Sequence, residues 1–458
     1  MNTGFVNTKP SHYGICLFDG RVPGPGWMAV DGGAARRIEG PGDLNTGTLW
    51  WVNLTYDECR DTGLLLNPWV RHSGFLRASM DALVDDLGLV PAPPSQRAQE
   101  LSGYFERLMR LVARAGVVPR AASLTHDLAQ VFPPAAFPSD DIEQPCRHAY
   151  QDWTRTHVRP PGAGVTVALH FPRIPYAWRQ LQIPVPDAAC SWTFIPPSSL
   201  PPGRDRLSWI SRLQVPSLVK VRLNRIQPEV SDIFAFGTGA RDNDSSLLRR
   251  QWMSEPEAMA LIALTDTADT EIVIEGVWLA NRSCPQTPPA AFDFLWNDAA
   301  FAASWSAGVL AENLWVASCA RERIAPRSGR AQRVSFRAVW ARAVDRVRLC
   351  QIALALRAKG WAVLNYGVGA LRVSITPDAK HELLADALAL GLVPPLSLTL
   401  GASDQVPLPL EWGGEDLAVT EALLRAHGNS GALRKLDTLH LLSPLEQAEV
   451  LHSIEGLA

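Results

Sequence analysis

The sequence predicts an α+β protein with more than one domain, in which a C-terminal ferredoxin-like βαββα unit is followed by helices. Three observations support this prediction. The chain has 458 residues, which is enough for two or three ordinary hydrophobic cores. Segments with helical and strand spacing alternate without an internal repeat. A strand, a helix, a hairpin and a second helix follow one another between residues 333 and 392.

We expect three domains. Residues 1–160 form a mixed α+β domain, residues 161–325 a Pro-rich and mixed middle domain, and residues 330–458 the ferredoxin-like unit with C-terminal helices. In the first domain, short apolar runs closed by Gly and Asp predict strands at His12–Phe18, Trp27–Val30 and Leu49–Leu54. Apolar residues at helical spacing then predict helices at Phe75–Leu87 and from Gln96 to Ala115.

Proline dominates residues 118–206, which excludes long helices there and disfavours central strands. We expect irregular structure with a short strand at Val165–His170 and a domain boundary near residues 158–164. Regular spacing returns afterwards and predicts two strands, two helices and a linker, at Leu218–Ile226, Glu271–Leu279, residues 254–263, Phe301–Arg323 (amphipathic) and residues 325–330.

The last domain has the clearest order of elements. We predict a strand at Val334–Trp340, a helix at Val344–Ala358, a hairpin that turns at residues 367–369, and a helix at Pro377–Leu390. This order is the βαββα unit. In the tail, Ser443 followed by Pro444 and Glu446 predicts a helix start with a capping box.

Charge and cysteine usage restrict the class of protein. The net charge of −3 and the pI of about 6.4 argue against a protein that attracts nucleic acid by bulk charge. The sequence has no apolar run of about 18 residues and no signal peptide at its start, so we expect no membrane partner. Its seven cysteines are an odd number without a CxxC pair, which favours a reduced cytoplasm and predicts no metal site.

Tryptophan and arginine are both unusually frequent. The chain has 16 Trp, and its 43 basic residues divide into 38 Arg and 5 Lys. A GC-rich coding genome explains the Arg excess, whereas Trp and Arg together are enriched at interface hot spots. No complete catalytic signature is present. Our first hypothesis is therefore a non-catalytic subunit or adaptor of a cytoplasmic multiprotein assembly, with protein partners.

An enzyme acting on a small or phosphorylated substrate is the second hypothesis. It rests on the loop of residues 236–246, where glycines allow close approach to an anion and charged side chains hold an anion or a hard cation; the candidate ligand-binding residues are Gly237, Gly239, Arg241, Asp242 and Asp244. The loop matches neither the P-loop nor the dinucleotide fingerprint, and a polar turn ending in a helix cap explains it as well. Catalytic residues are not nominated, and whether the protein is an enzyme stays open.

A nucleic-acid-associated module is the third hypothesis. Lys220, Arg222 and Asn224 alternate with Val219, Val221 and Leu223, so they share one face of the predicted strand and present it to a nucleic-acid backbone. The alternative is an ordinary exposed face on a half-buried strand. Cys146 and His148 are soft ligand types two residues apart, but a zinc site needs three or four ligands, and a buried apolar cysteine explains the pair better.

Residues 333–392 resemble the small C-terminal domain of fold-type I pyridoxal-phosphate decarboxylases and aminotransferases. The resemblance lies in the order of elements and in the run Gly369–Ile375. A Lys carries the cofactor in that family, and the resemblance would give this role to Lys220. Because Lys220 lies within an alternating strand pattern and no recognisable Asp partner for the pyridine nitrogen is present, the resemblance is one of topology, and we expect no cofactor.

Overall fold

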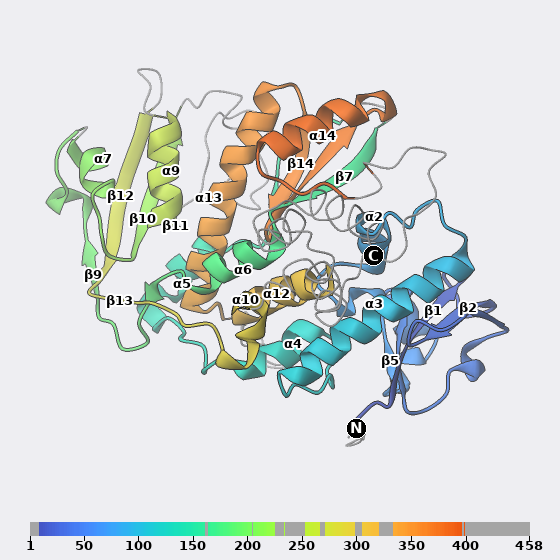
Figure 1. Ribbon diagram of the computed structural model, residues 1–458. Coiled ribbons are helices and arrows are strands. Elements are labelled where there is room, and N and C mark those ends of the chain that lie inside the picture. Colours follow the sequence, from blue (N-terminus) through green and yellow to red (C-terminus); the bar gives the residue numbers. More distant parts are fainter. Residues whose placement is uncertain are drawn as a thin grey trace, which may run out of the picture.

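The computed structural model describes residues 9–160, 164–203, 205–224, 233, 252–265, 271–297, 305–319, 333–395 and 398. Within these residues the chain is a mixed α+β protein with several sheets, as predicted (Figure 1). The division into three domains stays a prediction. The predicted linker at residues 325–330 and the predicted capping box at Ser443 lie outside the described residues. No helix in the described part is long and apolar enough to cross a membrane.

The first sheet has the strand order β3-β2-β1-β4-β5. β1 runs antiparallel to β2 and parallel to β4, and all three predicted strands of this region are confirmed. Trp50 and Trp51 point to opposite faces of β4; Trp51 belongs to the main core, and Trp50 to a smaller cluster on the other face. The strands are β1 (His12–Phe18), β2 (Gly26–Val30), β3 (Arg36–Ile38), β4 (Thr48–Val52) and β5 (Val70–Arg71).

Helices of the N-terminal half cover one face of this sheet. The predicted long helix is confirmed as α3, whose apolar stripe is buried against β1 and β2. The predicted helix at Phe75–Leu87 is shorter in the structure, because a 3-10 turn precedes it and Ser79 caps its start by accepting a hydrogen bond from the Ala82 N–H. The helices are α1 (Tyr56–Asp61), α2 (Met80–Asp86), α3 (Pro94–Arg114), α4 (Leu124–Leu128) and α5 (Asp140–Ala149).

A second, antiparallel sheet has the order β11-β10-β12-β9. The predicted strands at Leu218–Ile226 and Glu271–Leu279 are confirmed as β10 and β12, and the helix between them as α9. One face of this sheet is buried in a core that includes residues of α9. The elements are α7 (Asp205–Ile210), β9 (Trp192–Ile195), β10 (Ser217–Asn224), β11 (Trp252–Ser254), α9 (Glu255–Thr265), β12 (Glu271–Ala280), and a separate short pair, β8 (Val185–Pro186) and β13 (Ser283–Cys284).

A third sheet, in the order β6-β14-β15-β7, contains the predicted C-terminal hairpin. The predicted strand Val165–His170 pairs with β15 along its whole length. The last predicted helix begins as a 3-10 turn at Pro377–Ala379 and continues as α14. The elements are β6 (Thr154–Arg155), β7 (Val165–His170), β14 (Ala362–Gly367), β15 (Ala370–Ile375) and α14 (Lys380–Ala389).

The predicted strand at Val334–Trp340 is wrong. These residues mostly belong to α13 (Phe336–Ala358), which starts where Ser335 accepts a hydrogen bond from the Ala338 N–H at 3.1 Å. The βαββα order is therefore not found in the described residues. Figure 1 shows α13 between the β10–β12 sheet and the β14 hairpin, and it contacts both α9 and β14.

Three further helices complete the centre of the molecule: α6 (Arg173–Leu181), α10 (Phe294–Asn297) and α12 (Trp305–Ser318). The predicted helix at Phe301–Arg323 is confirmed as α12, but it is not amphipathic. Nearly all of its residues are buried, including Glu312 and Asn313, because α12 is packed against α3, α4 and α6. A helix that is buried all round needs a partner for every polar side chain, which makes this region the place to look for ion networks.

Candidate functional site

The predicted basic face of β10 is present. Lys220 and Arg222 are partly exposed, whereas Val219 and Val221 are buried in the core on the other side of the sheet. Asn224 ends β10 opposite Glu271, and its side chain lies outside the description. The alternation predicted for the strand therefore holds at the four positions where burial is described.

An acidic side chain that the sequence analysis did not consider lies between the two basic ones. Glu275 of β12 forms ion pairs with Lys220 (Nζ to Oε2, 3.5 Å) and with Arg222 (Nε to Oε1, 3.2 Å). The ladder between β10 and β12 shifts register here, since Lys220 faces Gly276 and Val221 faces Ile274. Glu275 is thus the extra residue of a bulge, and bulges re-aim side chains in this way. The three side chains together carry one net positive charge.

Aromatic side chains share this face of the sheet. Trp278 of β12 lies opposite Leu218, two residues before Lys220, and Phe194 of β9 lies opposite Trp278 with 5.1 Å between ring centroids. The Phe194 ring covers Gly276, where an added Cβ would come within 2.9 Å of it. Phe194 is 43% exposed. We call Lys220, Arg222, Glu275, Phe194 and Trp278 the outer sheet face.

The other predicted site residues do not form a site in the described part of the chain. Gly237, Gly239, Arg241, Asp242 and Asp244 lie outside the described residues, so the loop hypothesis stays a prediction. Cys146 and His148 both lie on α5, where burial raises the pKa of the Cys146 thiol well above its usual range. Among the residues that the structure describes, no group of three or more His, Cys, Asp or Glu side chains could hold a metal ion.

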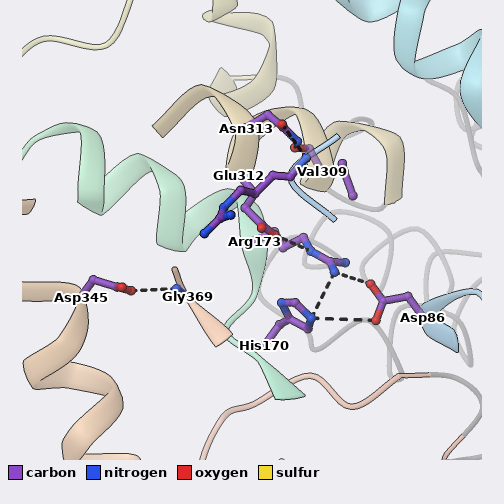
Figure 2. Close-up of polar contacts among 9 residues, drawn as sticks. Asp86, His170, Arg173, Val309, Glu312, Asn313, Asp345 and Gly369 are labelled. Atoms are coloured by element: carbon purple, nitrogen blue, oxygen red, sulfur yellow. Dashed lines mark hydrogen bonds and ion pairs between the residues drawn. The ribbon is translucent and has the colours of Figure 1, made fainter. Parts of the chain in front are cut away.

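Sequence reasoning missed a buried ion network at the centre of the molecule (Figure 2). Arg173 of α6 donates to Glu312 of α12 (Nε to Oε2, 3.1 Å) and to Asp86 of α2. His170 Nε2 lies 3.4 Å from Arg173 Nη2 and 4.0 Å from Asp86 Oδ1. Burial lowers the pKa of His170, and the Arg173 charge lowers it further, so the imidazole is neutral near pH 7.

A second buried carboxylate holds the turn of the C-terminal hairpin. Asp345 of α13 accepts hydrogen bonds from the Tyr176 hydroxyl at 2.6 Å and from the N–H groups of Val368 and Gly369 at 2.6 and 2.7 Å. Val368 has φ of +57°, a left-handed conformation that a β-branched residue adopts only under constraint. Burial raises the pKa of Asp345. The two N–H bonds supply the constraint on the turn.

A signal for these residues was present in the sequence but ambiguous. Charged residues in α13, such as Arg342, Asp345 and Arg346, recur at helical spacing, which is typical of a solvent-exposed face. In the structure all three are buried, because other helices and the hairpin pack on that face. Only the tertiary contacts distinguish the two cases.

No protein-family model matches the chain, and no curated protein matches it. Among solved structures the chain is similar to Phi29 DNA polymerase complexed with single-stranded DNA, at 8% identity and a TM-score of 0.41, over 81% of this chain and 82% of that chain. It is also similar to the ternary complex of Phi29 DNA polymerase with primer-template DNA and incoming nucleotides, at 9% identity and a TM-score of 0.39, over 82% of each chain. At this identity and these TM-scores the likeness does not define a shared fold.

Proposed function

We propose that the protein binds single-stranded nucleic acid on the outer sheet face. The observation that carries the proposal is the placement of two basic side chains, Lys220 and Arg222, on the same face as the exposed ring of Phe194. Sequence-tolerant binding of single strands combines backbone phosphates on Lys and Arg with bases stacked on aromatic rings. The outer sheet face offers both groups on adjacent strands.

The extent of the outer sheet face follows from its packing. At the Leu218 end the side chain is buried in the main core, and α5 packs against β10 and β11. Towards the other end Lys220 and Arg222 reach solvent, with Arg222 55% exposed. A bound strand would therefore lie across the Lys220–Arg222 end, with Phe194 and Trp278 on the neighbouring strands.

Glu275 gives this proposal a sharp signature. The carboxylate occupies both basic side chains, so a phosphate must displace it or share them with it. Removing the carboxylate should strengthen binding, whereas removing the basic groups should weaken it. A surface that merely repels its own charges would show no such opposite pair of effects.

The test measures anisotropy of a fluorescently labelled oligothymidine at low and moderate salt. We expect K220A/R222A to weaken binding at least tenfold and to reduce its salt dependence. We expect Phe194→Ala to weaken binding about five- to hundredfold, the range for losing one stacked base, and Glu275→Gln to strengthen it. Arg36→Ala, at an exposed position in the first sheet, is the control. Absence of binding at low salt, or equal affinity of the wild type and K220A/R222A, would refute the proposal.

An adaptor with protein partners is the second candidate. Trp50, Trp51, Trp315 and Trp340 are fully buried, so they serve the core and not an interface. The observation that favours a partner surface is Trp178 of α6, which is 36% exposed and packs beside Trp296 of α10 with 5.2 Å between ring centroids. Exposed Trp is the residue most enriched at hot spots.

The adaptor candidate is tested on this pair. Affinity purification from the source cell should recover the same partner proteins with the wild type and with Arg179→Ser, and lose them with Trp178→Ser. Arg179 neighbours Trp178 on α6 and is likewise exposed, which makes it the matched control. A partner set unchanged by Trp178→Ser would exclude this surface as the interface.

A further inference from the structure

Three arginines at the centre of the molecule have guanidinium nitrogens that are buried and without a hydrogen-bond partner in the described part of the chain. They are Arg77, which precedes α2, and Arg342 and Arg348 of α13. The atoms are Arg77 Nε, Arg342 Nε and Nη1, and Arg348 Nη1. An unpartnered buried charge is costly, so this arrangement calls for an explanation.

Other buried arginines of the chain are well satisfied. Arg173 is bound by two carboxylates. Arg346 donates to Glu257 and to two backbone carbonyls, and Arg337 donates to the Ser318 hydroxyl and to two carbonyls. The fold thus provides partners for buried guanidinium groups elsewhere, and the lack of partners is particular to this cluster.

The nearby carboxylates are engaged elsewhere. Asp86 and Glu312 are bound by Arg173, and Asp345 accepts the Tyr176 hydroxyl and two backbone N–H groups. Asp152 is the nearest acid to Arg342, with 3.5 Å between Oδ1 and Nε, but its side chain is 37% exposed and accepts the Tyr150 hydroxyl. The protein's own acids therefore leave guanidinium donors of the cluster unused.

Arg77 and Arg342 lie close enough to influence each other. Burial lowers the pKa of Arg77, and the positive charge of Arg342 lowers it further. Two like charges are brought together inside a protein when an anion binds between them. The rings beside the cluster are those of Trp315 under Arg342 (4.6 Å) and Trp153 under Arg77 (5.8 Å), and they hold each guanidinium plane in place.

The cluster reaches the surface at Trp153. The half-buried ring of Trp153 contacts the buried Arg77 on one side and the exposed Arg372 on the other, with 5.4 Å to the latter. Asp152, next in the chain, is the partly exposed acid beside Arg342. A small anion has a route from solvent to the cluster along these residues.

We infer that Arg77 and Arg342 bind a phosphate group of a small phosphorylated ligand, with Arg348 nearby on α13 adding a third positive charge. Several fixed N–H donors from more than one guanidinium match the tetrahedral oxygens of phosphate, and the forked geometry of Arg suits it. The site is distinct from the outer sheet face and uses neither Lys220 nor Arg222, so each proposal can fail without the other.

The test is binding of sodium tripolyphosphate, followed by isothermal titration calorimetry and by thermal unfolding against sodium chloride of equal ionic strength. We expect a saturable heat and a rise of a few degrees in Tm for the wild type. Arg342→Met and Arg77→Met should each weaken binding at least tenfold. Arg36→Ala, an exposed arginine in the first sheet, should behave as the wild type.

The unliganded variants provide an independent reading. Methionine at position 342 removes an unpartnered buried charge, so the Tm of unliganded Arg342→Met should equal or exceed that of the wild type. Should one variant fail to fold, the titration of the wild type and the other variant decide. Lack of a saturable heat in the wild type, unchanged affinity in both variants, or equal binding of citrate, which offers carboxylates only, would overturn the assignment.

Discussion

Glu255 illustrates how a single residue depends on its surroundings. It starts α9, a position where a carboxylate usually faces solvent near the helix N-terminus. In the structure Glu255 Oε2 accepts hydrogen bonds from the Ser217 N–H at 2.9 Å and from Trp340 Nε1 at 2.7 Å. Burial outweighs these bonds and raises the pKa of Glu255 to about 7.

This pKa predicts a pH dependence of stability. Because the pKa is raised in the folded state above its ordinary value of 4.5, the folded state binds the proton more tightly. The contribution to the free energy of unfolding is thus complete below about pH 4.5 and falls as the pH rises to about 7. The loss amounts to about 3 kcal/mol, at roughly 1.4 kcal/mol for each pKa unit.

Urea unfolding of wild type and Glu255→Gln across this pH range checks the prediction. The amide resembles the protonated acid and still accepts both hydrogen bonds, so the two proteins should be similar near pH 4.5 and diverge in favour of Glu255→Gln near pH 8. Glu382→Gln, at an exposed position of α14, controls for the loss of a charge. A constant difference between wild type and Glu255→Gln at all pH values would contradict a titrating Glu255.

Among the elements, α13 departs most from what the sequence predicts. The alternation of Val334, Phe336 and Ala338 with polar residues favours a strand, yet the helix starts at Phe336. Two causes act together. Ser335 is a good N-cap, and the first turns of α13 are buried on all sides by other elements, so tertiary packing overrides the local pattern.

A buried ion pair joins α13 to α9. Arg346 donates to Glu257 Oε1 through Nε at 3.0 Å and through Nη2 at 2.9 Å. We expect Glu257→Ala and Arg346→Ala each to cost about 3–5 kcal/mol, since either change leaves the other charge buried. The double variant should cost clearly less than the sum of the two.

Chemical unfolding of the four proteins in this cycle measures the coupling. The pair Lys359–Asp386, at the C-terminal end of α13, is the matched control because it is partly exposed. Its coupling should stay at or below about 1 kcal/mol. Additive effects at Arg346 and Glu257 would show that the pair does not hold α9 to α13.

On the scale of the whole molecule, Arg173 connects distant parts of the sequence. Its guanidinium binds Asp86 of α2 and Glu312 of α12, residues separated from it by 87 and 139 positions. The Arg173 side chain also lies over the Trp305 ring, 5.4 Å from its centroid. One side chain on α6 therefore neutralises two buried carboxylates from two other helices.

Arg173→Met should destabilise the fold by about 3–5 kcal/mol, because Asp86 and Glu312 then stay buried without their common partner. Urea unfolding measures this loss, and Arg179→Met on the exposed side of the same helix should change stability by less than about 0.5 kcal/mol. A cost below about 1 kcal/mol for Arg173→Met would mean that solvent, and not Arg173, satisfies the two acids.

The sequence by itself determined most of the secondary structure. Strands such as His12–Phe18 and the hairpin that turns at Gly367–Gly369 were predictable because period-2 alternation and turn residues act locally. The alternating positions of Lys220 and Arg222 were predictable for the same reason. These features depend on neighbours within a few residues along the chain.

Only the tertiary structure decided which charges are buried and what meets them. Glu275 beside Lys220, the carboxylates on Arg173, and the unsatisfied guanidinium groups of Arg77 and Arg342 all depend on contacts between remote segments. A charged residue at helical spacing has the same local pattern whether it faces solvent or the core. The physical difference is the desolvation imposed by the elements packed around it, and no local pattern contains that information.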